Sequence, residues 1–121
     1  MQEYIARSYL FVPATRIERV PKALAAGADA VIVDLEDAVA PADKRAARDT
    51  LARGFPDARS VLIRVNGPDT EWFADDLKMC AALRPLGVVV SKAETAEQLR
   101  EVSSRLQSGA ILLPLVETAR G

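Results

Sequence analysis

The chain has 121 residues, half of them hydrophobic, with 16 basic and 17 acidic side chains. This composition is typical of a folded globular domain, and the even charge balance gives no indication of a nucleic-acid or membrane-surface partner. A single cysteine excludes an intrachain disulfide and fits a cytoplasmic location, and the lack of histidine excludes Ser-His and Cys-His catalysis within this stretch. No apolar run approaches the roughly 20 residues that a membrane-spanning helix needs.

Short apolar runs alternate with amphipathic segments along the chain. The runs predict five strands, at residues 8–12, 30–35, 60–65, 87–90 and 110–116. The segments between them predict four helices, at about residues 16–26, 41–53, 70–83 and 95–107. Thr15 is expected to cap the first helix and Gly27 to end it, and Pro41 is expected to open the second.

Strands that alternate with helices of this length predict an α/β fold with a parallel sheet and right-handed crossovers. The inward side chains of the second and third helices are expected to be Ala42, Ala46, Ala47, Leu51, Trp72, Phe73, Leu77 and Cys80. Four βα units and a fifth strand make about half of the roughly 250 residues of a (β/α)₈ TIM barrel. An open doubly wound sheet is the structural alternative, although the first strand is not followed by its glycine-rich phosphate loop.

Polar side chains gather where the predicted strands end. They are Asp34, Glu36 and Asp37 after the second strand, Arg64 and Asn66 after the third, Ser91, Lys92 and Glu94 after the fourth, and Glu117 after the fifth. In parallel α/β folds the active site lies at this edge of the sheet. Charged groups on apolar strand ends are costly to bury without partners, so a ring of structural salt bridges is the alternative to a functional site.

The residue types at these positions restrict the chemistry. Carboxylates without histidine or thiolate suit a hard cation such as Mg²⁺, which takes oxygen ligands. Arg64 offers a planar fork for a substrate carboxylate. A metal and an arginine in one pocket suit a 2-oxo acid, because both stabilise developing oxyanions. The residues alone therefore predict metal-assisted carbonyl chemistry.

Five motifs in this sequence resemble the citrate lyase β-subunit and malyl-CoA lyase family, within the hydroxy-acid aldolase and citrate lyase superfamily. They stand in the family's order and cover nearly the whole chain: SYLFVPATR at 8–16, GADAVIVDLEDAV at 27–39, IRVN at 63–66, VSKAE at 90–94 and LVETARG at 115–121. A single such motif would be weak, whereas the set together is specific.

The resemblance implies that residues 1–121 are the N-terminal half of a TIM-barrel lyase domain, in a homo-oligomer (trimer or hexamer) with Mg²⁺ as cofactor. The implied reaction cleaves or forms a 3-hydroxyacyl thioester such as a citryl, malyl or citramalyl thioester. Its partners are an acyl-CoA or acyl-carrier-protein thioester and a 2-oxo acid such as oxaloacetate or glyoxylate. The alternatives are a thioester-independent 2-oxo-acid aldolase, whose branch usually carries an early histidine, and a non-catalytic half-barrel assembly subunit.

The motifs also imply roles for single residues. Glu117 corresponds to the first Mg²⁺ ligand, and Arg64 to the clamp on the 2-oxo acid and the enolate oxygen. Glu36 and Asp37 correspond to groups that hold metal-bound waters. The structural alternatives are a helix N-terminal carboxylate for Glu117, a partner of the strand-two acids for Arg64, and a purely structural role for Glu36 and Asp37.

Arg16 and Lys22 correspond to positions that meet the phosphates of coenzyme A or of a carrier arm, and Lys22 is otherwise a solvated helix lysine. In the family, a second metal carboxylate lies on the strand after the ETxxG motif, and the general acid or base comes from later segments or a neighbouring subunit. The sequence in hand ends before them, so we expect it to be a fragment of a longer protein.

Overall fold

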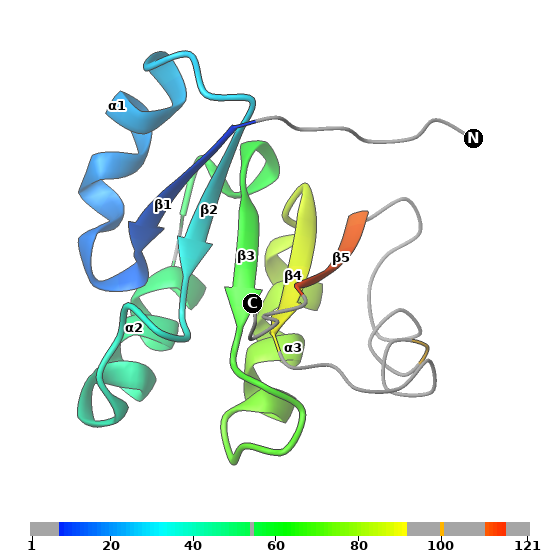
Figure 1. Cartoon of the computed structure of the whole chain (residues 1–121). Helices are drawn as coiled ribbons and strands as arrows, with labels where there is room; N and C mark the ends of the chain where they lie inside the picture. Colours follow the sequence, from blue (N-terminus) through cyan, green and yellow to red (C-terminus); the bar gives the residue numbers. More distant parts are fainter. Residues whose placement is uncertain (1–7, 54, 92–99, 101–110, 116–121) are drawn as a thin grey trace.

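A computed structural model describes residues 8–53, 55–91, 100 and 111–115 of the chain. The described strands form one sheet in which neighbours follow chain order: β1 (Tyr9–Pro13), β2 (Ala30–Asp34), β3 (Leu62–Val65), β4 (Gly87–Ser91) and β5 (Ile111–Leu115). Every neighbouring pair is parallel (Figure 1). The predicted parallel α/β sheet is confirmed.

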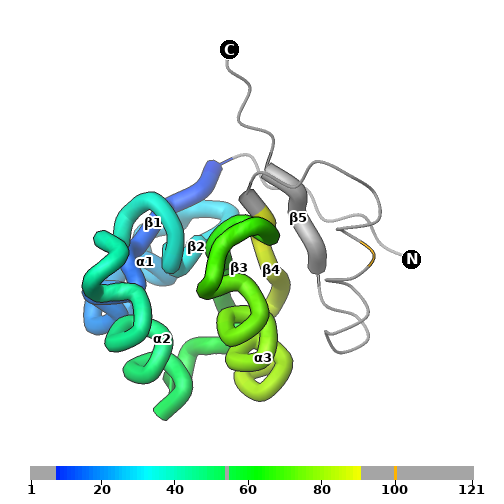
Figure 2. The backbone as a smooth tube through the Cα atoms, turned by 90° about the horizontal axis from the view of Figure 1, so that it is seen from below, coloured from blue at the N-terminus to red at the C-terminus, as the bar shows by residue number. Residues whose placement is uncertain are grey.

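The helical segments between these strands include three short 3-10 helices. The described segments are η1 (Ala14–Arg19), α1 (Val20–Ala25), η2 (Pro41–Asp43), α2 (Lys44–Ala52), η3 (Ala58–Ser60) and α3 (Phe73–Leu83). Figure 2 shows α1, α2 and α3 along the same side of the sheet. A doubly wound sheet reverses its strand order and carries helices on both faces. The described strands do not have that arrangement.

Apolar side chains lie on both faces of the sheet. The larger cluster packs between the strands and the helices and includes the fully buried Leu51 of α2 and Leu77 of α3. The smaller cluster lies on the opposite face and contains Ala30, Ile32, Leu62 and Val89. All five residues of β2 are buried, as expected for a strand that is covered on both faces.

The predicted start of the first helix is wrong. The chain forms η1 and then α1, Thr15 lies inside η1, and neither η1 nor α1 has a side-chain capping bond at its N-cap residue. Arg16 departs from helical geometry, with φ −133° and ψ 47°. Pro21, in the first turn of α1, has no N–H to continue a hydrogen-bonded ladder from η1, so the α-helix begins only there. Gly27 does end the helical segment, with a positive φ of 92°.

The predicted inner face of the second helix is only half right. Ala47 and Leu51 are buried, but Ala42 and Ala46 are exposed, and Lys44 is buried in their place. The helix opens with a 3-10 turn at η2, which has three residues per turn rather than 3.6. Lys44 stands three and seven residues before Ala47 and Leu51 in α2, so regular helical spacing places it on the same face. Ala46 lies on the opposite face of the helix, and Ala42 lies in η2.

The third helix packs largely as predicted. Phe73, Leu77 and Cys80 are buried in the main cluster. Trp72 is instead the half-buried residue that precedes α3, and Asp76 is buried beside the apolar side chains of the helix. The predicted helix at 95–107 lies outside the described residues apart from position 100. Within the described ranges, no helix combines the length and the apolarity needed to cross a bilayer.

The main cluster predicts a strong dependence of stability on Leu51, which is 0% exposed. We expect Leu51→Ala to lower the free energy of unfolding by about 2–5 kcal/mol, because it removes buried methyl groups and leaves a cavity. Lys78→Ala is the control, since Lys78 is exposed on α3 and its substitution should change stability by less than about 0.5 kcal/mol. Chemical denaturation measures both, and equal losses would contradict this description of the core.

Candidate active site

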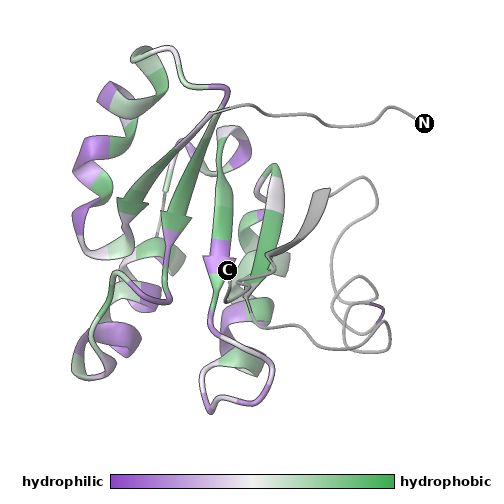
Figure 3. Cartoon of the chain, in the orientation of Figure 1, coloured by the Kyte–Doolittle hydropathy of each residue, from purple (hydrophilic) through white to green (hydrophobic). Residues whose placement is uncertain are grey.

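Charged side chains meet where β2 and β3 end. Asp34 is the last residue of β2 and is paired in register with Arg64 of β3. Figure 3 shows hydrophobic strands with hydrophilic segments at these carboxyl ends. The predicted clustering of polar groups at this edge of the sheet is therefore observed for these two strands.

Asp34 and Arg64 form a buried bidentate ion pair. Nε of Arg64 donates to Oδ1 of Asp34 at 2.9 Å, and Nη2 donates to Oδ2 at 2.6 Å. Both residues are less than 10% exposed, and the guanidinium lies 5.2 Å from the centre of the Phe11 ring. The hydrogen bond that Arg64 donates to Asp34 raises the pKa of Arg64, although burial opposes this shift, so the guanidinium stays cationic.

Two further carboxylates surround this guanidinium. Oε1 of Glu36 lies 3.6 Å from Nε of Arg64, and Oδ2 of Asp37 lies 3.8 Å from Nη2. Glu36 is buried, whereas the side chain of Asp37 is largely exposed. The structure thus brings together three of the residues that the sequence selected, Glu36, Asp37 and Arg64.

The carboxylate of Asp34 also organises the turn that follows β2. Its Oδ1 accepts a hydrogen bond from the backbone N–H of Glu36 at 2.7 Å, and its Oδ2 accepts one from Ala38 at 3.3 Å. One buried side chain therefore sets both the orientation of Arg64 and the path of the backbone that carries Glu36 and Asp37.

Lys44 belongs to the same cluster, and the sequence analysis missed it. Its ammonium donates to the carbonyl oxygens of Leu35 at 2.9 Å and Glu36 at 2.7 Å, and it lies 5.2 Å from the ring centre of Trp72. Burial lowers the pKa of Lys44, and the nearby carboxylates of Glu36, Asp76, Asp34 and Asp37 oppose this shift. A usable signal existed, because Lys44 stands three and seven residues before Ala47 and Leu51 and therefore shares their face of α2.

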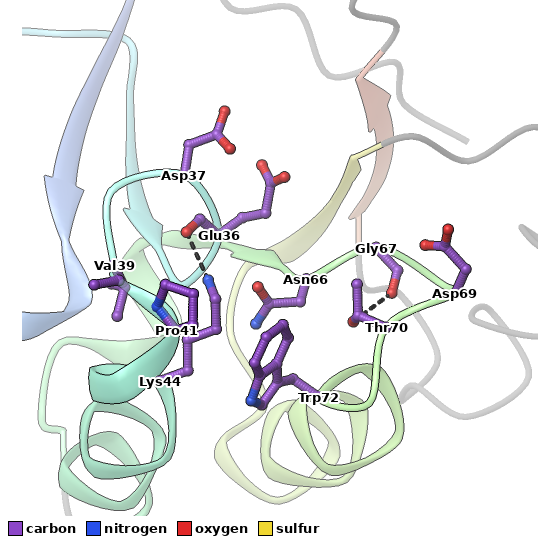
Figure 4. Close-up of a pocket in the computed structure, with 11 residues that line it drawn as sticks. Glu36, Asp37, Val39, Pro41, Lys44, Asn66, Gly67, Asp69, Thr70 and Trp72 are labelled. Carbon is purple, nitrogen blue, oxygen red and sulfur yellow. Dashed lines mark hydrogen bonds between the residues drawn. The ribbon is translucent and has the colours of Figure 1, made fainter.

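The residues around Lys44 line a pocket of about 430 Å³ between the turn after β2 and the loop after β3 (Figure 4). Glu36, Asp37 and Lys44 lie on one side of it, and Asn66 and Trp72 lie on the other. The pocket therefore adjoins the ion pair of Asp34 and presents both acidic and aromatic groups.

The end of β3 is fixed from behind by the buried Asp76 of α3. Its Oδ2 accepts hydrogen bonds from the backbone N–H and the side-chain amide of Asn66, at 3.0 and 2.7 Å. Its Oδ1 lies 3.5 Å from Nη1 of Arg48 on α2. Burial raises the pKa of Asp76, and its bonds with Asn66 and Arg48 oppose this shift. The side chain of Asn66 therefore holds the strand end in place.

The other residues that the sequence predicts for the site either lie on η1 and α1 or lie outside the described residues. Arg16 is exposed in η1, just after the carboxyl end of β1, and Lys22 is exposed on α1. Glu117, Lys92 and Glu94 lie outside the described residues, so the predicted metal ligand remains a prediction. Among the described residues, no group of three or more acidic or cysteine side chains is arranged to hold a metal ion by itself.

The ion pair predicts that Asp34→Asn is strongly destabilising. The substitution removes the bidentate charge partner of the buried Arg64 guanidinium and leaves the longer contacts to Glu36 and Asp37. We expect a loss of about 3–5 kcal/mol in the free energy of unfolding. Asp49→Asn on the exposed side of α2 is the control and should change stability by less than about 0.5 kcal/mol. Similar losses for both variants in chemical denaturation would rule out this role for Asp34.

The burial of Lys44 predicts a pH dependence of stability. Its pKa is 10.5 in the unfolded chain and lower in the folded protein. Between these two values the unfolded chain binds more protons at Lys44, so this residue makes the free energy of unfolding rise with pH. Wild-type protein should therefore gain stability relative to Lys44→Met as the pH approaches 10.5 in chemical denaturation. Arg45→Met, on the exposed face of α2, should retain the gain; a constant wild-type advantage over Lys44→Met would contradict the prediction.

Comparison with known proteins identifies the family. Residues 7–111 match the family described as HpcH/HpaI aldolase/citrate lyase. A citrate lyase subunit beta-like protein of Mycobacterium tuberculosis is 44% identical over 113 residues, which cover 93% of this chain and 39% of the relative. A (3S)-malyl-CoA thioesterase of Cereibacter sphaeroides is 36% identical over 124 residues, covering 99% of this chain and 43% of the relative.

Solved structures of citrate lyase beta subunits are also similar to this chain. The M. tuberculosis citrate lyase beta subunit complexed with oxaloacetate and magnesium matches with a TM-score of 0.76 and 43% identity, over 93% of this chain and 48% of that one. A second structure from the same organism, complexed with magnesium, acetoacetate and coenzyme A, matches with a TM-score of 0.77. The chain spans less than half the length of these curated relatives. It belongs to the HpcH/HpaI aldolase/citrate lyase family.

Proposed function

We propose that the protein is a Mg²⁺-dependent carbon–carbon lyase that cleaves or forms a 3-hydroxyacyl thioester. The observation that carries this proposal is the buried Arg64, held by Asp34 and flanked by Glu36 and Asp37 at the carboxyl edge of a parallel sheet. Relatives of known structure contain magnesium together with oxaloacetate or with coenzyme A, which supports the same class of chemistry.

Residues 1–121 would form the N-terminal half of a TIM-barrel lyase domain. The chain-order sheet with α1, α2 and α3 on one side is the arrangement that eight such units close into a barrel. The opposite face carries a second apolar cluster, and Tyr9 and Phe11 of β1 are 44% and 46% exposed. Further strands of a barrel would cover these side chains.

Arg64 would bind the carboxylate and the developing oxyanion of the 2-oxo acid. Its guanidinium is fixed on one side by two hydrogen bonds and stacked over Phe11, so little of its orientation has to be set when a ligand arrives. An arginine presented in this way suits planar, bidentate recognition of a carboxylate.

The acidic residues fit a magnesium site in their chemistry. Glu36 and Asp37 provide carboxylate oxygens beside Arg64, and Mg²⁺ prefers oxygen ligands and retains several waters. These two residues would hold metal-bound waters, and Glu117 would ligate the ion directly. When bound, Mg²⁺ would supply Lewis-acid stabilisation of the oxygen atoms of the 2-oxo acid.

In the cleavage direction, the C2–C3 bond of the acyl chain breaks and the C3 hydroxyl loses its proton to a base, which leaves the 2-oxo carbonyl group of the acid product. The electron pair of the broken bond passes to the thioester as an enolate, which takes up a proton to give the acyl thioester. Arg64 would hold the 2-oxo acid during this step. Arg16 and Lys22 would contact the phosphates of coenzyme A or of a carrier-protein arm, and both are exposed to such a ligand.

Hydrolysis of the thioester is the second candidate function, because one relative at 36% identity is named a malyl-CoA thioesterase. It differs in its products. A lyase releases an acyl thioester and a 2-oxo acid, whereas a thioesterase releases free coenzyme A and an intact hydroxy acid. The same substrate therefore separates the two.

The test is turnover of malyl-, citramalyl- and citryl-CoA by the whole protein with Mg²⁺, with 2-oxo acid and free coenzyme A measured separately. We expect 2-oxo acid release that requires Mg²⁺ and that falls in Glu117→Ala. Arg64→Lys keeps the charge but loses the bidentate geometry, and should lower kcat by about 10²–10³-fold.

The controls use substitutions away from this cluster. Arg45→Met on the exposed face of α2 should retain wild-type turnover. Metal-independent turnover, or release of coenzyme A without a 2-oxo acid, would contradict the lyase assignment. Aldol activity on free 2-oxo acids and aldehydes would favour the aldolase alternative, and a stable oligomer without activity would favour an assembly subunit.

A further inference from the structure

We infer that Lys44 is a positioning residue, which fixes the peptide carrying Glu36 and Asp37 and so orients both carboxylates toward the magnesium and 2-oxo-acid site. This inference rests on the proposed function for the site itself, but no comparison and no motif assigns Lys44 a role. It follows from the contacts of a side chain that lies on α2, outside the strand ends where the other site residues lie.

The backbone of Glu36 is held at both of its polar groups. Its N–H donates to Asp34 at 2.7 Å, and its carbonyl oxygen accepts from the Lys44 ammonium at 2.7 Å. The ammonium also binds the carbonyl of Leu35 at 2.9 Å. Because two successive carbonyls are held by one buried cation, the turn has little freedom to rotate and redirect its side chains.

The bonds from Lys44 are made to the main chain and not to the carboxylates of Glu36 and Asp37. The ammonium bonds to carbonyl oxygens of the main chain, and Figure 4 shows the carboxylates of Glu36 and Asp37 on the far side of this peptide. Lys44 therefore contributes geometry to the site from behind, while Arg64 lies on the side of the carboxylates, 3.6 Å from Glu36.

A buried lysine is energetically unfavourable at a position where only packing is needed. Lys44 is 6% exposed, and burial of an ammonium carries a large desolvation cost unless its protons are bound. Here two charge-assisted hydrogen bonds and the face of Trp72 offset that cost. An apolar residue of similar volume would avoid the cost altogether, but it could not hold two carbonyls.

Three substitutions in the whole protein test this inference. Lys44→Met keeps an unbranched side chain one atom shorter and removes its donors. Lys44→Arg keeps a cation with several donors, and Arg45→Met is the matched control on the exposed face of α2. The measurements are the Mg²⁺ concentration for half-maximal turnover, kcat and KM for the thioester, and hydrogen exchange of the backbone amides at Glu36 and Ala38.

Lys44→Met should raise the half-saturating Mg²⁺ concentration or lower kcat by about 10–100-fold, the usual effect of removing a group that orients a metal site. KM for the thioester should stay within about twofold, because Arg16 and Lys22 are unaffected, and exchange at Glu36 and Ala38 should accelerate. Lys44→Arg should recover part of the loss, and Arg45→Met should match wild type. If Lys44→Met does not fold, Lys44→Gln, which retains a donor, replaces it with the same readouts.

Wild-type Mg²⁺ dependence and kcat in a folded Lys44→Met protein would overturn the inference. So would an equal loss in Arg45→Met. The failure of the proposed function looks different: the wild-type protein would then show no Mg²⁺-dependent 2-oxo acid release. In that case, unchanged amide exchange at Glu36 in Lys44→Met would overturn the positioning role as well, and faster exchange would uphold it.

Discussion

The buried contact between Asp34 and Arg64 joins β2 to β3 at the edge of the sheet where the polar groups gather. Such a pair adds little net stability, since both charges lose their hydration, but removal of one partner leaves the other uncompensated. The pair instead fixes the orientation of the groups around it. The guanidinium and the turn after β2 are both set by the same carboxylate, so neither can move without disturbing the other.

A second set of contacts holds this edge from the helix side. Lys44 of α2 reaches the turn after β2, while Asp76 of α3 reaches the end of β3 through Asn66. Arg48 links the two helices by its contact with Asp76. The strand ends are thus supported by side chains from the helices behind them, and a site built on such support keeps its geometry without a ligand.

An open, chain-order sheet is what we expect of a chain that covers less than half the length of its curated relatives. Strands in chain order with α1, α2 and α3 on one side leave an apolar face opposite them, and the chain spans less than half of its curated relatives. The exposed side chains of β1, Tyr9, Leu10 and Phe11, lie at the edge of the described sheet. In the proposed barrel these features have one explanation, because closing strands would cover them.

The strand-end position of Arg64 and the family resemblance of Glu36 and Asp37 selected these residues for the candidate site. Local pattern alone determined much else: the alternation of strands and helices, the parallel sheet, and the end of the first helix at Gly27. These follow from periodicity and from turn chemistry, which act over a few residues. Only the tertiary structure decided that Asp34 pairs with Arg64, 30 positions away, and that Lys44 turns inward. Both depend on which groups meet across elements: the guanidinium of Arg64 meets the carboxylate of Asp34, and the ammonium of Lys44 meets the carbonyls that follow β2.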